Sequence, residues 1–229
     1  MGSWARIRSR MAFTNACGGL RWDMQADGLI VVEGQGTPSF APGSVQFVQM
    51  ERTWTNWSGL FQAASSATGV PAAWLLAIAT EETGLWSDDA EDQASKVSYA
   101  GARGIMQIMP ATAQLFGALP DAMFEPSANI HVGAVLLAKL ASARDGQLPE
   151  MAAAYNSGHV CSQGRNQWNL AMADDYAGNV IKWNNSAVMY LDMGASPVKL
   201  LAGLALGAGG LFAAAVIAGF APRPRWARV

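Results

Sequence analysis

Glu82-Thr-Gly84, Gly104-Ile-Met-Gln107 and Ala154-Tyr-Asn-Ser-Gly158 are the three stretches that decide how this 229-residue chain folds. Each of them combines glycine with a polar or ionisable side chain, and each lies beside a run of residues with helical periodicity. In this order along the chain they predict a cleft between helices, built around one working carboxylic acid. Such a cleft is typical of enzymes that cut glycan chains.

The first stretch ends a helix that we predict from residue 71 to residue 83. Apolar residues recur at four-residue steps along it, so an apolar stripe leads up to Glu82. Gly84 is expected to stop the helix, which places Glu82 in the last turn. There, apolar surroundings and the helix dipole should raise its pKa above the ordinary ~4.3, as a general acid at neutral pH requires. Glu81 lies about 100° round the helix and is expected to be solvated.

The other two stretches supply candidates for holding a sugar. Gly104 permits a tight turn, and Gln107 offers both a donor and an acceptor to a sugar amide or hydroxyl. Methionines such as Met109 give adaptable apolar surface against a pyranose ring, although an ordinary turn with core methionines is the alternative. Tyr155 can stack on a sugar and direct its hydroxyl towards a carboxylate, and Asn156 can bond an acetamido group.

Composition excludes several classes of protein. The net charge is −2 with only 15 basic residues, so the chain has no basic face for nucleic acid. Cys17 and Cys161 lack CxxC spacing, and the sequence has no HExxH motif or paired histidines. We therefore expect no metal and no cofactor. Whether the two cysteines pair is left open by the sequence.

Residues 200–221 form an uncharged apolar run long enough to cross a bilayer as a helix. We interpret it as a transmembrane helix, because a buried core helix of that length would be expected to show a polar face. Gly203 and Gly207 form GxxxG spacing, a weak indication of helix self-association in lipid. The arginines that follow predict a cytoplasmic tail, with residues 1–199 on the opposite side of the membrane.

The N-terminus has no apolar stretch typical of a secretory signal. A wall-facing domain with a C-terminal anchor would then reach its substrate by another route. Delivery inside a virus particle would solve this, as would an inverted topology. A phage protein carried in the virion, which opens the wall locally as the phage enters its host, is therefore one expectation.

The ordered motifs, together with Asn129 to Leu137 and Tyr176, resemble the soluble lytic transglycosylase family over roughly residues 52–185. The resemblance implies a mainly α, goose-lysozyme-like catalytic domain and cleavage of the bond between N-acetylmuramic acid and N-acetylglucosamine in peptidoglycan. It implies that Glu82 is the single catalytic acid and that the product ends in 1,6-anhydromuramic acid. Groove residues and the aromatic that supports the acid are implied at Ser98, Gln107, Met109, Tyr155, Asn156 and Tyr176.

The chain departs from the family pattern in the acidic stretch 86–93, which is longer than usual and is expected to be a solvated loop. A sharper alternative is that one of its carboxylates serves as the second catalytic group of a lysozyme-type hydrolase: Asp88, Asp89, Glu91 or Asp92. A glycan-binding virion protein without activity is a further alternative, although it would have no reason to keep an acid at position 82.

The predicted organisation joins these parts in a membrane-anchored chain whose catalytic domain faces the cell wall. Its segments are an irregular lead (1–51), the catalytic domain (52–185), a linker (186–199), the transmembrane helix (200–221) and a basic tail (222–229). Within the lead, a short strand is expected at Leu29 to Glu33, and the first core helix is expected to begin near Arg52.

Overall fold

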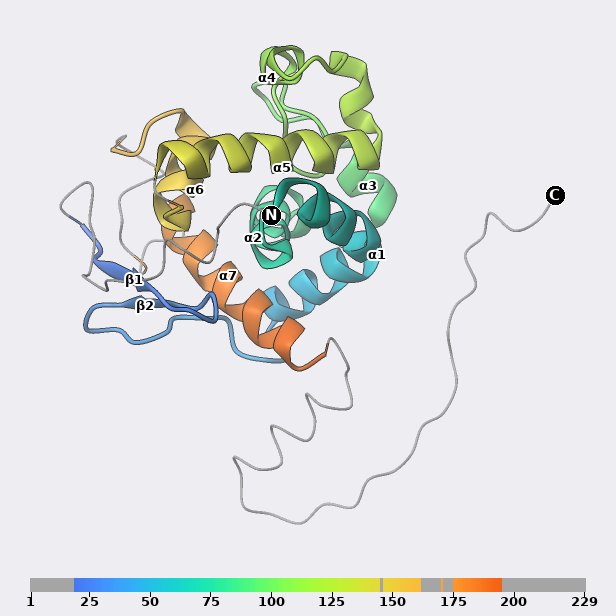
Figure 1. Ribbon diagram of the computed structural model, residues 1–229. Coiled ribbons are helices and arrows are strands. Elements are labelled where there is room, and N and C mark those ends of the chain that lie inside the picture. Colours follow the sequence, from blue (N-terminus) through green and yellow to red (C-terminus); the bar gives the residue numbers. More distant parts are fainter. Residues whose placement is uncertain (1–18, 145, 162–169, 171–174, 195–229) are drawn as a thin grey trace, which may run out of the picture. The chain divides into compact units, whose positions relative to one another are not determined.

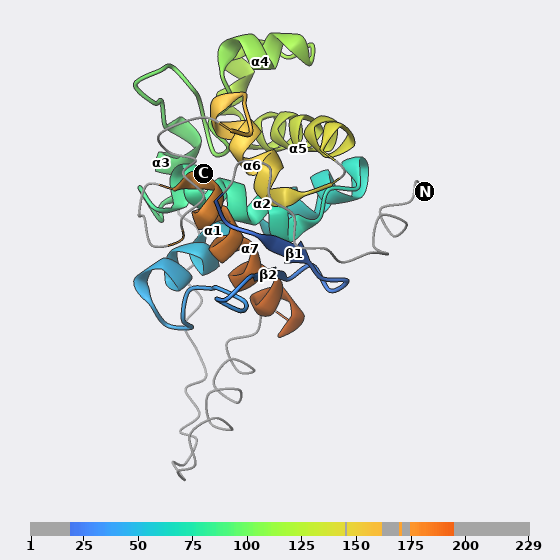
Figure 2. The same ribbon diagram turned by 90° about the vertical axis from the view of Figure 1, so that its left-hand side faces the viewer.

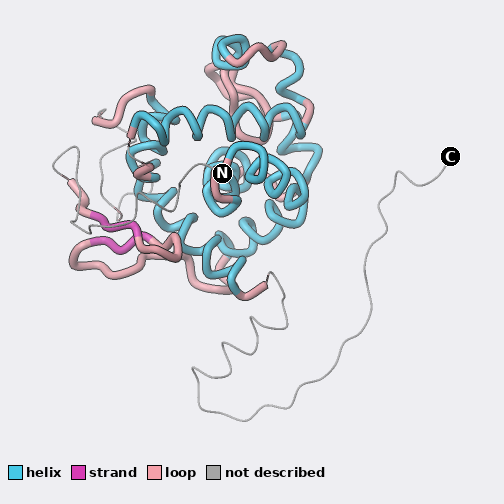
Figure 3. Tube along the Cα trace, viewed as in Figure 1, coloured by secondary structure: helices cyan, strands magenta, loops and turns pink. Residues whose placement is uncertain are grey.

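The computed structural model of the chain describes residues 19–144, 146–161, 170 and 175–194, which belong to the compact unit Met1–Ala195 (Figure 1). Helices dominate this unit, as the sequence predicts, and the strands form one short hairpin (Figure 3). The elements in chain order are β1 (Trp22–Met24), β2 (Ile30–Val32), α1 (Val45–Thr68), α2 (Ala72–Ala79), the π-helical turn η2 (Thr80–Gly84), α3 (Ala90–Ser95), α4 (Pro110–Leu115), the 3-10 turn η3 (Pro120–Phe124), α5 (Pro126–Ala143), α6 (Leu148–Ser157) and α7 (Tyr176–Asp192).

Helix α2 is the centre of the core. Every residue from Ala73 to Ala79 is buried, and the helix contacts α1, α5 and α7 (Figure 1). A helix that is apolar on all sides is stable in water only when other elements surround it. The turn η2, which continues α2 and carries the candidate acid, therefore starts from a helix that is packed on all sides.

Helix α1 begins seven residues before the predicted Arg52. Ser44 caps it, because its Oγ accepts a hydrogen bond from Phe47 N at 3.2 Å. At the other end Gly69 adopts the left-handed conformation with φ 78°, which ends α1 before α2 begins. The predicted boundary after residue 51 consequently falls inside a helix.

The N-terminal lead needs correction for residues 22–40. The expected strand is present as β2, but it pairs with β1 in an antiparallel hairpin that the sequence analysis did not predict. The hairpin lies beside α7 (Figure 2), where Asn185 Oδ1 accepts from Ile30 N at 2.7 Å and its Nδ2 donates to Ile30 O at 2.8 Å. Trp22 is fully buried. This part of the lead is a docked part of the fold, not an irregular appendage.

The acidic side chains of the stretch 86–93 are exposed, as predicted, but the stretch is not a loop throughout, because residues 90–95 form α3. Asp89 caps α3 by accepting from the backbone N–H groups of residues 91 and 92, at 2.9 and 3.1 Å. Asp88 forms an ion pair with Arg52 of α1. Gln93 is fully buried, and its Oε1 accepts from Trp57 Nε1 at 2.6 Å. The stretch is thereby fastened to α1.

The predicted transmembrane helix 200–221, with Gly203 and Gly207, lies outside the described residues. Among the residues that the structure does describe, no helix has both the length and the apolar character needed to span a bilayer.

Candidate active site

Glu82 lies on η2, where the α-helical hydrogen-bond pattern of α2 gives way to a π-helical one. Leu85 N donates to Thr80 O, five residues earlier, at 3.0 Å. The side chain of Thr83, a residue of this turn, stabilises it by donating to Ile105 O at 2.9 Å. The predicted α-helical last turn is therefore wrong in detail, and the acid sits on a π turn of the kind that is frequent at functional sites.

Gly84 is required for a different reason from the one predicted. It does not adopt a left-handed conformation, and the helical chain continues into Leu85 with φ −71°. A Cβ at Gly84 would instead lie 2.5 Å from Thr53 Oγ1 of α1. Gly84 lets η2 approach α1 closely. The sequence predicts a helix stop at this glycine instead.

Tyr176, in the first turn of α7, donates its hydroxyl to Glu82 Oε1 at 2.7 Å. Its side chain is fully buried. Burial, followed by the negative charge of Glu82, raises the pKa of Tyr176 well above its ordinary value of 10.0. The phenol is consequently a permanent donor to the half-buried acid, and Asp175 holds the start of its helix by accepting from Gly178 N at 3.1 Å.

Tyr155 of α6 also faces the acid, but its hydroxyl has a different partner from the expected carboxylate. It donates to the backbone oxygen of Met106 at 2.7 Å. Burial, and then the charge of Glu82, raise the pKa of Tyr155 well above 10.0. Tyr155 therefore ties the loop of the second motif to the helix of the third.

The loop of the second motif is held by Asn129 of α5, a residue that the sequence analysis gave no role. This asparagine is fully buried, and its Oδ1 accepts from Met106 N at 2.8 Å. Its Nδ2 donates to Arg103 O at 2.8 Å and to Met123 O at 2.9 Å. Gly104, with φ 71°, is required there because a Cβ would run into Met123 O and the amide of Asn129.

Gln107 has the one positive φ of a non-glycine residue in the described part of the chain, at 48°. Its Nε2 donates to Gly104 O at 2.8 Å and to Lys96 O at 3.3 Å. The predicted double role needs correction, because the amide hydrogens serve the backbone. The group that Gln107 can offer to a sugar is its acceptor Oε1.

The remaining predicted groove residues differ in what they do. Ser98 accepts from Ala102 N at 3.0 Å and closes a turn. Met109 is 40% exposed and so presents apolar surface to solvent, whereas Met106 is fully buried, as the core alternative predicts for that methionine. Asn156 is half-buried at the end of α6.

Lys96, which follows α3, is a site residue that the sequence analysis missed. Its Nζ donates to the backbone oxygen of Glu82 at 2.5 Å and lies 5.4 Å from the ring centre of Trp86. The indole of Trp86 is 56% exposed. A single basic residue after an acidic run gives no local signal of this contact, because α3 must first fold back onto α1.

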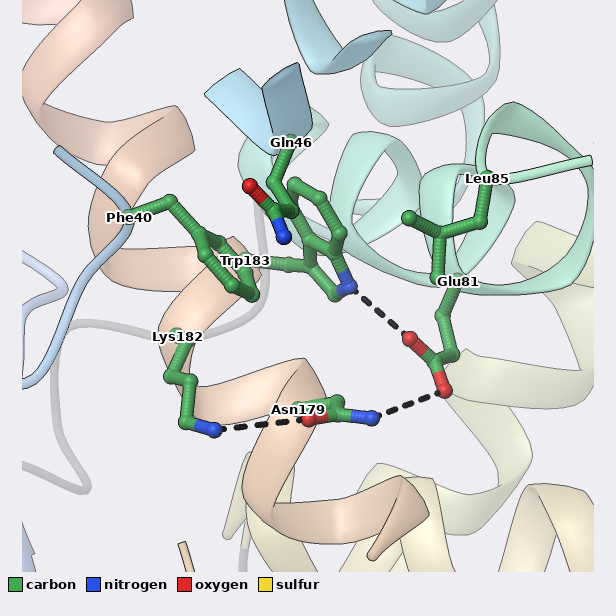
Figure 4. A pocket seen from close by; sticks show the side chains of 7 residues that line it. All are labelled: Phe40, Gln46, Glu81, Leu85, Asn179, Lys182 and Trp183. Atoms are coloured by element: carbon green, nitrogen blue, oxygen red, sulfur yellow. Dashed lines mark hydrogen bonds between the residues drawn. The ribbon is translucent and has the colours of Figure 1, made fainter. Parts of the chain in front are cut away.

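Glu81 is anchored, not solvated as predicted. Its Oε2 accepts from Trp183 Nε1 at 2.9 Å and its Oε1 from Asn179 Nδ2 at 3.3 Å (Figure 4). The carboxylate borders a pocket of about 300 Å³ that Phe40 and Lys182 also line. Burial lowers the pKa of Lys182, and the charges of Asp175 and Glu81 partly oppose this.

The sequence predicts no metal site and leaves open whether its two cysteines pair. Within the described ranges, no group of three or more histidine, cysteine or acidic side chains could hold a metal ion. Cys161 is disulfide-bonded. Cys17, the other cysteine of the chain, lies outside the described residues.

Comparison with known proteins gives one family and several solved structures. The family described as Transglycosylase SLT domain matches residues 59–175, about half of the chain. The chain is similar to the 70 kDa soluble lytic transglycosylase from Escherichia coli, at 23% identity and a TM-score of 0.47 over 59% of this chain and 24% of that one. No curated protein sequence matches the chain significantly.

Two more structures show a similar degree of likeness. An inactive mutant of the lytic transglycosylase Slt from Pseudomonas aeruginosa matches at 23% identity and a TM-score of 0.46, over 62% of this chain and 25% of that one. A complex of the 70 kDa soluble lytic transglycosylase with bulgecin A matches at 22% identity and a TM-score of 0.49, over 62% and 26%. The chain thus spans about a quarter of the length of these structures.

Proposed function

The chain belongs to the transglycosylase SLT domain family, and from this membership we propose that it is a lytic transglycosylase that cuts the glycan strands of peptidoglycan with Glu82. The observation that carries the proposal is the 2.7 Å hydrogen bond from Tyr176 to Glu82 Oε1. It fixes the orientation of the carboxyl group that would act on the substrate. Because Tyr176 keeps its proton, it can support Glu82 in both protonation states.

One carboxyl group is enough for the proposed reaction. Protonated Glu82 gives its proton to the oxygen that links N-acetylmuramic acid to N-acetylglucosamine, and the C1–O bond breaks. The resulting carboxylate then takes the proton of the muramyl 6-hydroxyl, whose oxygen bonds to C1. The products are a free 4-hydroxyl on the leaving strand and a 1,6-anhydromuramyl end, and Glu82 is protonated again.

The arrangement of the acidic stretch favours this reaction over that of a lysozyme-type hydrolase, which uses two carboxylates flanking the scissile bond. Asp88 pairs with Arg52, and Asp89 caps α3. Asp92 accepts from Ser87 Oγ at 2.9 Å. These three carboxylates therefore have structural partners within the stretch and on α1.

Digestion of purified peptidoglycan tests the proposal. The wild type and the Glu82→Gln and Glu91→Gln variants should be compared by mass spectrometry of the released fragments. Glu91 is an exposed residue of α3 and the remaining candidate for a second carboxylate, so its variant tests the hydrolase alternative and also controls for the loss of one charge. We expect anhydro ends from the wild type and from Glu91→Gln, and activity reduced by at least about 10³-fold in Glu82→Gln. Reducing ends in place of anhydro ends would indicate a hydrolase, and an active Glu82→Gln would refute the role of the acid.

We also propose that residues 200–221 anchor the enzyme in a membrane with the catalytic domain facing the wall. The uncharged length of this segment supports the anchor, and its GxxxG spacing supports self-association. Local opening of the wall near that membrane, as when a phage enters its host, is the proposed role. Deleting residues 200–229 should release the protein from vesicles in a flotation assay. Continued flotation of the shortened chain would count against the anchor.

A further inference from the structure

Glu81, the neighbour of the candidate acid, is held by two side chains of α7. Trp183 and Asn179 each donate one N–H to it, at 2.9 and 3.3 Å (Figure 4). Trp183 is fully buried, and its ring packs on Phe40 with 4.1 Å between the ring centres. Because the indole cannot easily move, its N–H fixes the position of the Glu81 carboxylate.

The same helix holds both glutamates. Tyr176, Asn179 and Trp183 are three and four residues apart, so they lie on one face of α7. Tyr176 bonds to Glu82, and the other two bond to Glu81. Two consecutive residues of a single π-helical turn are thus fastened to one rigid element.

We propose that Glu81 is a positioning residue for the reaction assigned to Glu82: its two bonds to α7 fix the turn that carries the acid, and its charge acts on that acid. The proposal rests on the proposed function. Each carboxylate oxygen of Glu81 accepts one of these N–H groups, whereas in glutamine an NH₂ group, which cannot accept, takes the place of one oxygen. In Glu81→Gln, one donor of α7 would face an NH₂ group, and the turn would shift or rotate.

The charge of Glu81 provides a readout that a purely structural residue would not move. Among the residues that the structure describes, the titratable and charged groups around Glu82 include Tyr176 of α7, Tyr155 of α6 and Lys96 after α3, besides Glu81 itself. Removing one negative charge reduces like-charge repulsion and favours the ionised form of Glu82. The general acid would then lose its proton at lower pH, so activity would fall earlier as the pH rises.

The experiment compares full-length Glu81→Gln and Trp183→Phe with the wild type, and Glu125→Gln, at an exposed residue just before α5, is the control for loss of a charge. Rates on purified peptidoglycan give kcat and KM, and are repeated across pH; thermal unfolding checks the fold. We expect kcat to fall about 10- to 100-fold in Glu81→Gln, with KM within about two-fold, because a small misplacement of a catalytic group lowers the rate by this order. The alkaline limb of its pH profile should move to lower pH.

Trp183→Phe separates position from charge. It keeps an aromatic ring and the Glu81 carboxylate but loses the N–H donor, so we expect a lower kcat with an unmoved pH profile. Equal kcat and an equal pH profile in Glu81→Gln and the wild type would overturn the inference. If Glu81→Gln does not fold, a fully active Trp183→Phe would overturn it instead. Glu82→Gln in the same assay reports on the proposed function separately, since a wild type that cuts no peptidoglycan refutes that function first.

Discussion

Replacing Asn129 by leucine is expected to lower both the stability and the activity of the protein. The side chain is fully buried and makes three hydrogen bonds to the backbone, at 2.8, 2.8 and 2.9 Å. Leucine fills a similar volume but leaves Met106 N and two carbonyl oxygens without this partner. At about 1 kcal/mol for each bond, and more where a buried group stays unpaired, the free energy of unfolding should fall by about 3 kcal/mol. For a chain of this size, that corresponds to a loss of roughly 6–12 °C in Tm.

Asn185→Leu is the matched control for this prediction. Asn185 is equally buried and also bonds three backbone groups, Ile30 N, Ile30 O and Pro38 O, at 2.7 to 2.8 Å. It ties the hairpin to α7 and does not touch the loop of the second motif. Both variants should therefore lose similar stability, as measured by thermal unfolding.

Activity separates the two variants, provided that it is measured well below both transitions. Asn129→Leu should lose at least about 10-fold in kcat/KM, because the loop from Gly104 to Gln107 is released beside the acid. Asn185→Leu should stay within about two-fold of the wild type. Equal activity of the two variants would refute the argument that Asn129 positions the site, and a Tm within about 2 °C of the wild type would refute the energetic one.

Three further predictions follow from single contacts. Tyr176→Phe removes a hydrogen bond to the charged Glu82, worth about 1.5–3 kcal/mol, so initial rates on peptidoglycan should fall about 10- to 100-fold. Gly84→Ala would push a methyl group into α1 and should lower the free energy of unfolding by about 1–3 kcal/mol. Gly59→Ala, in open space on α1, should raise the free energy of unfolding by about 0.5–1 kcal/mol. Urea unfolding measures both effects. The pKa values of Tyr155 and Tyr176 are raised, so above pH ~10 the folded protein keeps protons that the unfolded chain releases. The contribution of these two groups to the free energy of unfolding should therefore be complete below pH ~10 and decrease above it. Unfolding followed by circular dichroism measures this decrease.

The helix that leads to Glu82 could be predicted because its signal is local. Apolar residues at helical spacing and a proline at the start mark α2 in any context. The π turn could not be predicted in the same way. It depends on the bond from Thr83 to Ile105 and on the approach of Gly84 to Thr53, contacts that exist only after distant segments have packed.

The chemical roles of polar side chains were harder to predict than their positions. Gln107 lies in the loop of the second motif, but its amide hydrogens bond to backbone oxygens, which no sequence pattern reveals. Glu81 is predicted to be solvated because it lies about 100° round the helix from Glu82 and its apolar stripe. Its donors come from α7, about a hundred residues later, and the sequence analysis had interpreted only Tyr176 of that helix.

Helix α7 connects the site to the N-terminal hairpin. Tyr176, Asn179 and Trp183 bond to the two glutamates, while Asn185 and Ser186, two and three residues after the last of these, bond to the backbone of residues 30–40. The first turns of α7 thus bond to η2, and the later turns bond to the hairpin and the segment that follows it. A shift of α7 along its axis would have to break both sets of bonds together. Residues 22–40 therefore belong to the same folded unit as the site, and this unit begins before residue 59, where the family match starts.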